Sequence, residues 1–251
     1  MRTVLTYLAI VVMTIAFGVP IVVGTMFGMK VRPGSFWEEI PRIWARVVLR
    51  AAGARVVVIN PQHIAHGEPR VYVSNHVSWF DVFALATILP RYRFMAKKEL
   101  FKIPIFGPAA GQVAGIYIDR QNRKAAFESY RDAAEQIRSG ISVAVYPEGT
   151  RGRSYELRPF KKGPFVLAIA AQVPIVPCVV HGTKEIQGKG DVAVRAGEIE
   201  ITLLEPIPTA GMTYEDRDDL LRRVWVAMAA ELERYGVHSN GRMSDTEVNV
   251  A

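Results

Sequence analysis

The first thirty residues are almost free of charge, and this feature constrains the fold more than any other. No residue between Arg2 and Lys30 is charged. A continuous helix here would be about 40 Å long, more than the roughly 30 Å of a hydrocarbon core. Pro20 would kink it, so a re-entrant or shallow insertion is an alternative to a full span. A secretory signal has a shorter apolar region and a small-residue cleavage site, and neither is evident, so we predict an uncleaved membrane anchor.

Residues 35–52 predict a second helix, because apolar side chains recur at helical spacing and the charges lie largely on other faces. It could pack its apolar stripe on a folded domain, or lie in the membrane interface with Trp37 and Trp44 at headgroup level. Either way, residues 1–52 form a hydrophobic two-helix membrane-anchoring segment. Arg2 stands alone before the apolar stretch, and more basic residues follow it: Lys30, Arg32, Arg42, Arg46 and Arg50. This bias places the rest of the chain in the cytoplasm if the first helix spans.

The remaining sequence alternates between short apolar runs and amphipathic stretches. Segments typical of strands are Arg55–Ile59, Arg70–Ser74, Tyr92–Ala96, Gly115–Ile118, Ile141–Tyr146, Ile175–Val180 and Glu198–Leu204. Helical stretches are Phe80–Leu89, Asn122–Ser139, Phe160–Ala171 and Tyr214–Tyr235. The alternation predicts an α/β domain over residues 53–236, with a mixed sheet flanked by helices. Residues 237–251 are polar and predict a disordered tail.

The pair His76 and Asp81 is the strongest candidate for chemistry. Histidine is the side chain best suited to act as a base near neutral pH, and a carboxylate can orient its ring and stabilise its charged form. On an ideal helix the two side chains would point about 140° apart, so they can meet only if the chain bends between them. The change from strand to helix supplies that bend. A simpler interpretation is that Ser78 and Asp81 form a capping box beside an ordinary loop histidine.

Three further segments repeat a pattern of short strands followed by turns or charges. Val145 to Arg151 follows a buried strand and presents Glu148, Thr150 and Arg151 beyond its end, where α/β sheets usually bind ligands. Gly115 to Arg120 is an apolar strand that ends in charge. Val173 to Pro177 contains two prolines, which predicts an edge strand or a pocket wall rather than a central strand.

Composition excludes several functions. The net charge of +7 favours anionic lipid, phosphate or nucleic acid as partners, but the basic residues are dispersed beside an apolar anchor, which disfavours nucleic acid. No Cys/His group has zinc spacing, and the single Cys178 cannot form an internal disulfide. Gly188 to Ala193 matches Gly-x-Gly-x-x-Ala but opens no helix, so it does not predict a nucleotide site. No Gly-x-Ser-x-Gly nucleophile elbow is present.

These segments occur in the order known from one family. Asn75-His76-x4-Asp81, Gly115-Ile-x-Ile-Asp119-Arg120, Pro147-Glu-Gly-Thr-Arg151 and Val173-Pro-Ile-Val-Pro177 resemble the glycerolipid acyltransferase family, specifically the 1-acylglycerol-3-phosphate acyltransferases. The resemblance runs from about Val71 to His181. One departure is Tyr146, where phenylalanine is common. The resemblance implies transfer of an acyl group from acyl-CoA or acyl-carrier protein to the sn-2 hydroxyl of lysophosphatidic acid, at a membrane, with no cofactor or metal.

Site residues can then be assigned from what this reaction needs. The acceptor hydroxyl must lose a proton, so His76 is the expected base and Asp81 its partner. The acceptor phosphate calls for cations, for which Arg120 and Arg151 follow strand ends. Lys97 resembles the family's third phosphate contact, with Lys98 as the fallback. Glu148, Gly149 and Thr150 complete the predicted substrate site, with Glu148 either bonding the glycerol hydroxyl or ordering the Arg151 loop. Another lyso-lipid acceptor, a lipid hydrolase and a non-catalytic lipid-binding protein remain alternatives.

Overall fold

A seven-stranded mixed sheet forms the centre of the molecule, as predicted. The computed structural model describes residues 1–31, 34–64, 67–118 and 132–239. The strands are β1 (Ala54–Ile59), β2 (Val71–Ser74), β3 (Tyr92–Lys97), β4 (Gly115–Ile118), β5 (Ser142–Val145), β6 (Ile175–His181) and β7 (Gly197–Leu203). Their order is β1-β7-β6-β2-β5-β3-β4, and all neighbours are parallel except β6 and β7. Each strand lies within one residue of its predicted bounds.

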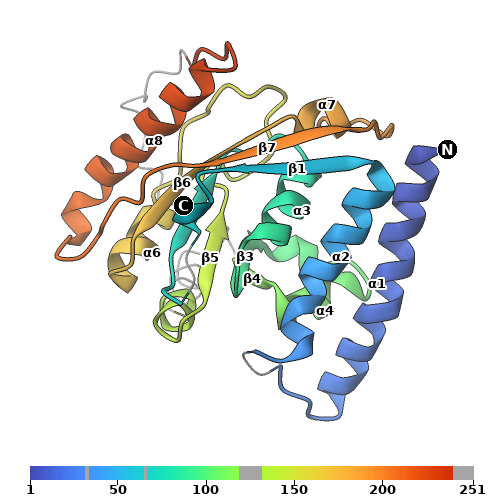
Figure 1. Ribbon diagram of the computed structural model, residues 1–251. Coiled ribbons are helices and arrows are strands. Elements are labelled where there is room, and N and C mark those ends of the chain that lie inside the picture. Colours follow the sequence, from blue (N-terminus) through green and yellow to red (C-terminus); the bar gives the residue numbers. More distant parts are fainter. Residues whose placement is uncertain (32–33, 65–66, 119–131, 240–251) are drawn as a thin grey trace.

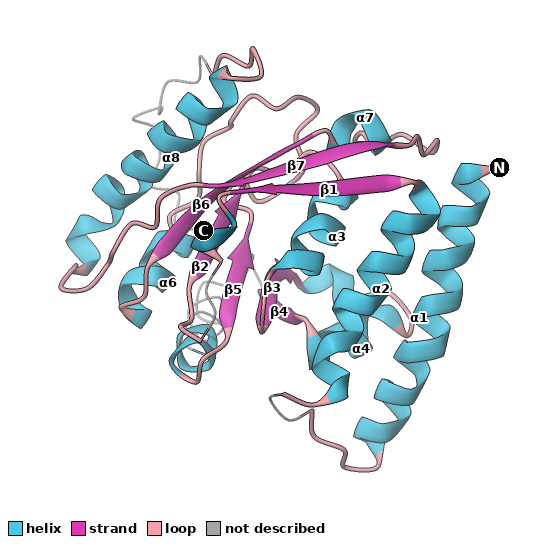
Figure 2. Ribbon diagram, in the orientation of Figure 1, coloured by secondary structure: helices cyan, strands magenta, loops and turns pink. Residues whose placement is uncertain are grey.

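Helices cover both faces of the sheet (Figures 1 and 2). The helices α6 (Gly163–Ala171) and α8 (Arg217–Glu233) pack on one face, and α2 (Phe36–Ala52) and α3 (Trp79–Ile88) pack on the other. Two short helices, α4 (Phe106–Val113) and α7 (Thr183–Gln187), were not predicted, because each is too short to display helical periodicity. Of the predicted Asn122–Ser139 helix, residues 132–138 are helical and the earlier part lies outside the described residues.

The helix α1 (Arg2–Met26) runs alongside α2, antiparallel to it, and continues through Pro20 (Figure 1). In the part of the chain that is described, it is the one helix long and apolar enough to cross a bilayer. At 1.5 Å per residue it is about 38 Å long. Many of its large apolar side chains are exposed: Val4, Leu5, Leu8, Val11, Val12, Ile15, Val19, Val23 and Met26. An apolar surface of this extent indicates membrane contact.

The second helix packs its apolar stripe on the domain. Its buried side chains are Ile40, Ala45, Val48, Leu49 and Ala52. Trp44 contacts Phe83 of α3 edge-on, with ring centroids 5.1 Å apart, and its indole N–H donates to the Thr14 hydroxyl at 3.2 Å. Trp44 is partly buried between α1 and α3, which favours the interpretation in which this helix packs on the domain, and the alternative position at headgroup level stays a prediction. The division of the chain at residue 52 stays a prediction, as does the disordered tail, most of which lies outside the described residues.

The segment Val173 to Pro177 is not at an edge of the sheet, which corrects the prediction. Strand β6 lies between β7 and β2. The carbonyl of Pro177 accepts from the Leu204 N–H at 2.9 Å, on the side of β7. The proline nitrogen faces the same side, beyond the last β6–β7 pair, Cys178 and Leu203. The missing N–H thus falls in the irregular stretch between the regular β6–β7 ladder and the isolated bridge of Ile175 with Ile207, and the pairing with β2 loses no hydrogen bond.

Candidate active site

His76 and Asp81 meet at the turn from β2 into α3. The Nδ1 atom of His76 lies 2.9 Å from Oδ2 of Asp81. The same Oδ2 accepts from the backbone N–H groups of Val77 at 2.7 Å and Ser78 at 2.8 Å. Ser78 is the N-cap of α3, and the capping box with Asp81 is complete. The two interpretations of Asp81 therefore coexist, because one carboxylate both caps the helix and holds the histidine ring.

The turn that carries His76 is fixed on both sides by neighbouring strands. Asn75 is buried, and its side-chain amide exchanges two hydrogen bonds with the backbone of Val180 in β6, at 2.9 and 2.8 Å. The backbone N–H of His76 donates to Glu148 at 3.0 Å, and its carbonyl accepts from the Gly152 N–H at 2.7 Å. The loop after β5 thus holds the backbone of His76 at both of its polar groups.

The ring of His76 lies flat on Tyr146, with centroids 3.9 Å apart and planes 16° from parallel. Only 13% of the His76 side chain is exposed. An ionised Asp81 can only accept, so the proton between the two groups belongs to Nδ1. Nε2 is then the nitrogen available to a substrate. Burial, followed by the charge of Asp81, raises the pKa of Tyr146 well above its ordinary value, so this neighbour stays neutral.

Glu148 connects the turn that carries His76 to the loop after β5 by hydrogen bonds. Its Oε1 accepts from His76 and its Oε2 accepts from Nε of Arg158 at 2.8 Å. Arg158 also donates to the carbonyl of Thr150. Burial raises the pKa of Glu148, and the contacts with Arg158 and His76 oppose that rise. Since both carboxylate oxygens are engaged and the side chain is buried, the geometry favours the loop-ordering role over the predicted bond to a glycerol hydroxyl.

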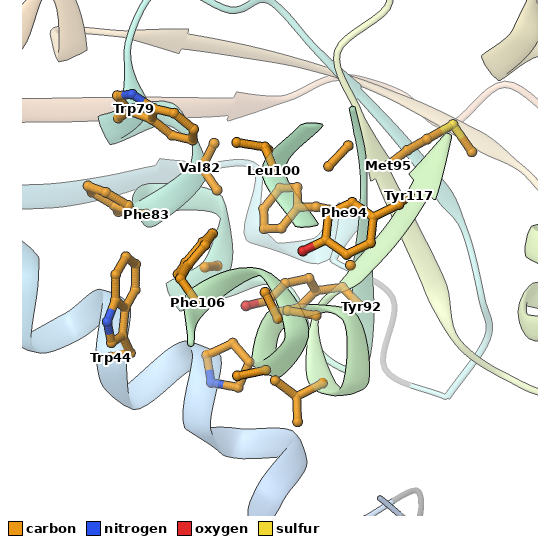
Figure 3. A pocket seen from close by; sticks show the side chains of 18 of the residues that line it. Trp44, Trp79, Val82, Phe83, Tyr92, Phe94, Met95, Leu100, Phe106 and Tyr117 are labelled. Carbon is orange, nitrogen blue, oxygen red and sulfur yellow. The ribbon is translucent and has the colours of Figure 1, made fainter. Parts of the chain in front are cut away.

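An apolar cavity of about 330 Å³ opens beside His76. Figure 3 shows its aromatic wall, in which Trp44, Phe83 and Phe106 come from three different helices. Helix α1 closes another side with Phe17, Gly18 and Ile21. At its His76 end the cavity is bordered by Gly149, Thr150 and Arg151, which belong to the loop that holds the His76 backbone, and Lys97 also lines the cavity. The cavity can hold a hydrocarbon chain whose reactive end lies at the histidine.

Two of the predicted cations line the cavity. Cζ of Arg151 lies 4.9 Å from the centre of the Trp79 ring, and burial lowers the arginine pKa, opposed by the charge of Asp81. Lys97 is exposed at the end of β3. Gly149 has a φ of +76°, which glycine adopts without strain, and Thr150 beside it is exposed. Arg120 lies outside the described residues.

Several residues of the site were not found from the sequence. Arg158 was missed because an exposed-looking arginine gives no signal until its partner is known. Thr183, which bonds Asp81, lies 102 positions further along the chain. The cavity walls from α1, α2 and α4 were also missed, because apolar helical positions look the same whether they face a core or a cavity. Val173 to Pro177, expected near a pocket, is not among the residues that line this cavity.

In the described residues, no group of three His, Cys, Asp or Glu side chains is placed to hold a metal ion.

Comparison with known proteins agrees with this geometry. The family model "Acyltransferase" matches residues 55–181. Human 1-acyl-sn-glycerol-3-phosphate acyltransferase alpha is 34% identical over 191 residues, which are 75% of this chain and 68% of that protein. The human beta enzyme is 37% identical over 166 residues, 65% of this chain and 60% of that protein. The crystal structure of the 1-acyl-sn-glycerophosphate acyltransferase PlsC from Thermotoga maritima has the same fold, with a TM-score of 0.73, 23% identity, and coverage of 95% of this chain and 99% of that one.

Proposed function

The chain belongs to the acyltransferase family, and on this premise we propose that it moves a fatty acyl group from an acyl thioester to the sn-2 hydroxyl of 1-acyl-sn-glycerol-3-phosphate, forming phosphatidic acid. The observation that carries the proposal is the bond between His76 and Asp81 at the polar end of an apolar cavity. A base, a space for an acyl chain and nearby cations are the parts that this reaction needs.

His76 acts as the general base. The acceptor hydroxyl gives its proton to Nε2 of His76 while its oxygen bonds to the thioester carbonyl carbon. Asp81 keeps Nδ1 protonated and stabilises the imidazolium that forms. When the carbon–sulfur bond breaks, the thiol leaves with the proton from Nε2. No acyl-enzyme is needed in this sequence of steps.

Ser78 and Cys178 are poorly placed to serve as nucleophiles. The Ser78 hydroxyl donates to the Gln187 carbonyl at 2.6 Å while accepting from the Phe80 N–H, so it is occupied as a helix cap. Cys178 is fully buried in β6, and burial raises the pKa of its thiol. These contacts support direct attack of the acceptor on the donor.

The acceptor phosphate binds at Arg151, with Lys97 and Arg120 as further contacts. Arg151→Ala is expected to raise the KM for the acceptor by about thirtyfold, because a lost charged contact to phosphate costs on the order of 2 kcal/mol. The KM for the donor should change little. Arg153→Ala removes an exposed arginine two residues away and serves as the matched control. An unchanged acceptor KM in Arg151→Ala, or full activity on an acceptor without phosphate, would contradict the phosphate site.

The enzyme is membrane-associated, and α1 is the contact. Phe17, Gly18 and Ile21 of α1 line the cavity, while other apolar side chains of the same helix are exposed on the surface of the molecule. The acyl site is thus separated from lipid only by α1. The first turns of α1 are tied to the domain, since Arg2 donates to the Ala52 carbonyl and Tyr7 to the Val192 carbonyl. This supports insertion of α1 beside the domain rather than away from it. The basic residues after α1 support the cytoplasmic face.

Polar substitution on the exposed face of α1 should weaken membrane binding without unfolding the protein. Val11 and Ile15 are about half exposed and lie one turn apart. Val11→Ser combined with Ile15→Ser is expected to lower the fraction that sediments with vesicles, because less apolar surface enters the bilayer. Val226→Ser, at an equally exposed valine on α8, is the control. Equal vesicle binding by the double variant and the control would show that α1 is not the contact.

The acceptor is tested with the purified protein, acyl-CoA and acyl-carrier-protein donors, and a panel of acceptors. The panel holds lysophosphatidic acid, lysophosphatidylcholine, a lyso-ornithine lipid and monoacylglycerol. We expect phosphatidic acid to form with a much higher kcat/KM than any other product. Faster acylation of another lyso-lipid would show that the proposed acceptor is wrong, although the protein would still be an acyltransferase. No acylated product with any acceptor would overturn the proposed function.

A further inference from the structure

Thr183 is a fully buried threonine at the start of α7, next to the site but outside the matched segments. The chain reaches it from β6 through Gly182, whose φ is +89°. A Cβ at position 182 would lie 2.0 Å from the carbonyl oxygen of Glu198, so only glycine fits there. The tight turn sends the chain back toward α3 and places Thr183 against Asp81.

The hydroxyl of Thr183 donates to Oδ1 of Asp81, the oxygen that His76 does not use. Oδ2 accepts from His76, Val77 and Ser78. The carboxylate is thus held at both oxygens, by groups from two different elements, and it cannot rotate without breaking hydrogen bonds on both sides. Because Asp81 is itself fully buried, no water reaches it to replace a lost donor.

We propose that Thr183 is a positioning residue for the acyl transfer, acting through Asp81 on the ring of His76; this inference rests on the proposed function. With its Oδ1 donor removed, the buried carboxylate is held at Oδ2 alone, so it can pivot about that oxygen and lose its alignment with Nδ1. The ring of His76 then loses its fixed orientation and its preference for the Nδ1–H tautomer, and Nε2 is less often free to accept the acceptor proton.

The polar neighbours of Thr183 are already satisfied by other groups. The Tyr155 hydroxyl donates to Glu185 at 2.7 Å and accepts from the Lys184 N–H at 3.0 Å. The Gln187 carbonyl at the other end of α7 accepts from Ser78. The Thr183 hydroxyl also bonds the Tyr155 oxygen, where it opposes the rise of the Tyr155 pKa as the smallest of the contributions. Tyr155 keeps Glu185 and Lys184 as partners when that hydroxyl is lost, so the removal acts chiefly on Asp81, and a valine, which has nearly the same shape, leaves the packing in place.

The experiment compares Thr183→Val, Thr183→Ser and Thr202→Val with the wild-type enzyme. Thr202 is the matched control, because it is also a buried threonine but its hydroxyl has no hydrogen-bond partner. We expect Thr183→Val to lower kcat by about ten- to a hundredfold, the rate equivalent of a lost hydrogen bond to a charged group, with both KM values nearly unchanged. Thr183→Ser, which keeps the hydroxyl, should recover most of kcat, and Thr202→Val should match the wild type.

A second readout does not depend on turnover. Nitrogen-15 NMR of histidine-labelled protein, with His76→Ala to assign the signals, reports the tautomer of His76. Thr183→Val is expected to lower the Nδ1–H population, whereas Thr183→Ser and Thr202→Val should not. A kcat for Thr183→Val within about twofold of wild type, equal losses in the serine and valine variants, or an unchanged tautomer would overturn the proposal. Absence of acyl transfer by the wild-type enzyme would instead overturn the proposed function, and the NMR comparison would still test Thr183.

Discussion

His76→Ala is expected to leave a folded, membrane-bound protein whose kcat is lower by about 10²–10⁴-fold, the usual contribution of a general base. Alanine keeps the backbone contacts of position 76 with Glu148 and Gly152, because these use the main-chain N–H and carbonyl. The loop therefore stays in place while the proton acceptor is lost. Initial rates at saturating donor and acceptor measure the effect, and the melting temperature reports the fold.

His238→Ala is the matched control for this variant, since His238 is exposed after α8. It should retain wild-type kcat. A near-normal kcat in His76→Ala would mean that His76 is a loop residue beside a helix cap and that another group takes the proton.

Asp81→Asn is expected to lower kcat by about 10²–10⁴-fold while the helix cap survives, because a neutral amide cannot stabilise the imidazolium. The amide oxygen can replace Oδ2 and accept from Val77 and Ser78. The amide nitrogen would then face the Thr183 hydroxyl, which can accept as well as donate. The geometry can thus persist, so the loss of rate measures the carboxylate charge.

Asp81→Ala separates the two functions of this residue. It removes the charge and also the acceptor of the buried Val77 and Ser78 N–H groups, while Ser78 stays as the N-cap. It should therefore lose activity and also stability, by about 1–3 kcal/mol for each buried donor left without a partner. Kinetics and thermal denaturation of the two variants are compared. If Asp81→Asn keeps wild-type kcat, Asp81 acts as a cap alone and the dyad assignment fails.

Much of the site could be predicted because its residues follow strand ends. His76 and Arg151 come after β2 and β5, and Lys97 is the last residue of β3. These strands are parallel neighbours, so their carboxyl ends meet at one edge of the sheet. The spacing of His76 and Asp81 required a bend, and the change from period-two to helical patterning placed it correctly. Each of these features can be recognised within a few residues of sequence, and the parallel pairing of the strands then brings the side chains together.

The rest of the site depends on packing between distant segments. Nothing near Thr183 or Arg158 in the sequence indicates a partner in the active site, because the hydrogen bonds to Asp81 and Glu148 appear only when α7 and the loop after β5 are docked. Pro177 was misplaced for a similar reason. A proline is excluded from a central strand only where its missing N–H would be needed in a regular ladder, and the sequence does not reveal where the regular pairing with β7 stops.

If the acceptor attacks the thioester directly, with His76 as base, release of the donor thiol depends on the acceptor. Purified protein is mixed with an acyl-CoA, with and without lysophosphatidic acid, and free thiol, phosphatidic acid and intact protein mass are followed together. Direct attack predicts thiol release only when acceptor is present, equal amounts of thiol and phosphatidic acid, and unmodified protein throughout. Protein that gains the mass of an acyl group, or thiol released at the same rate without acceptor, would contradict it and indicate an acyl-enzyme or a hydrolase.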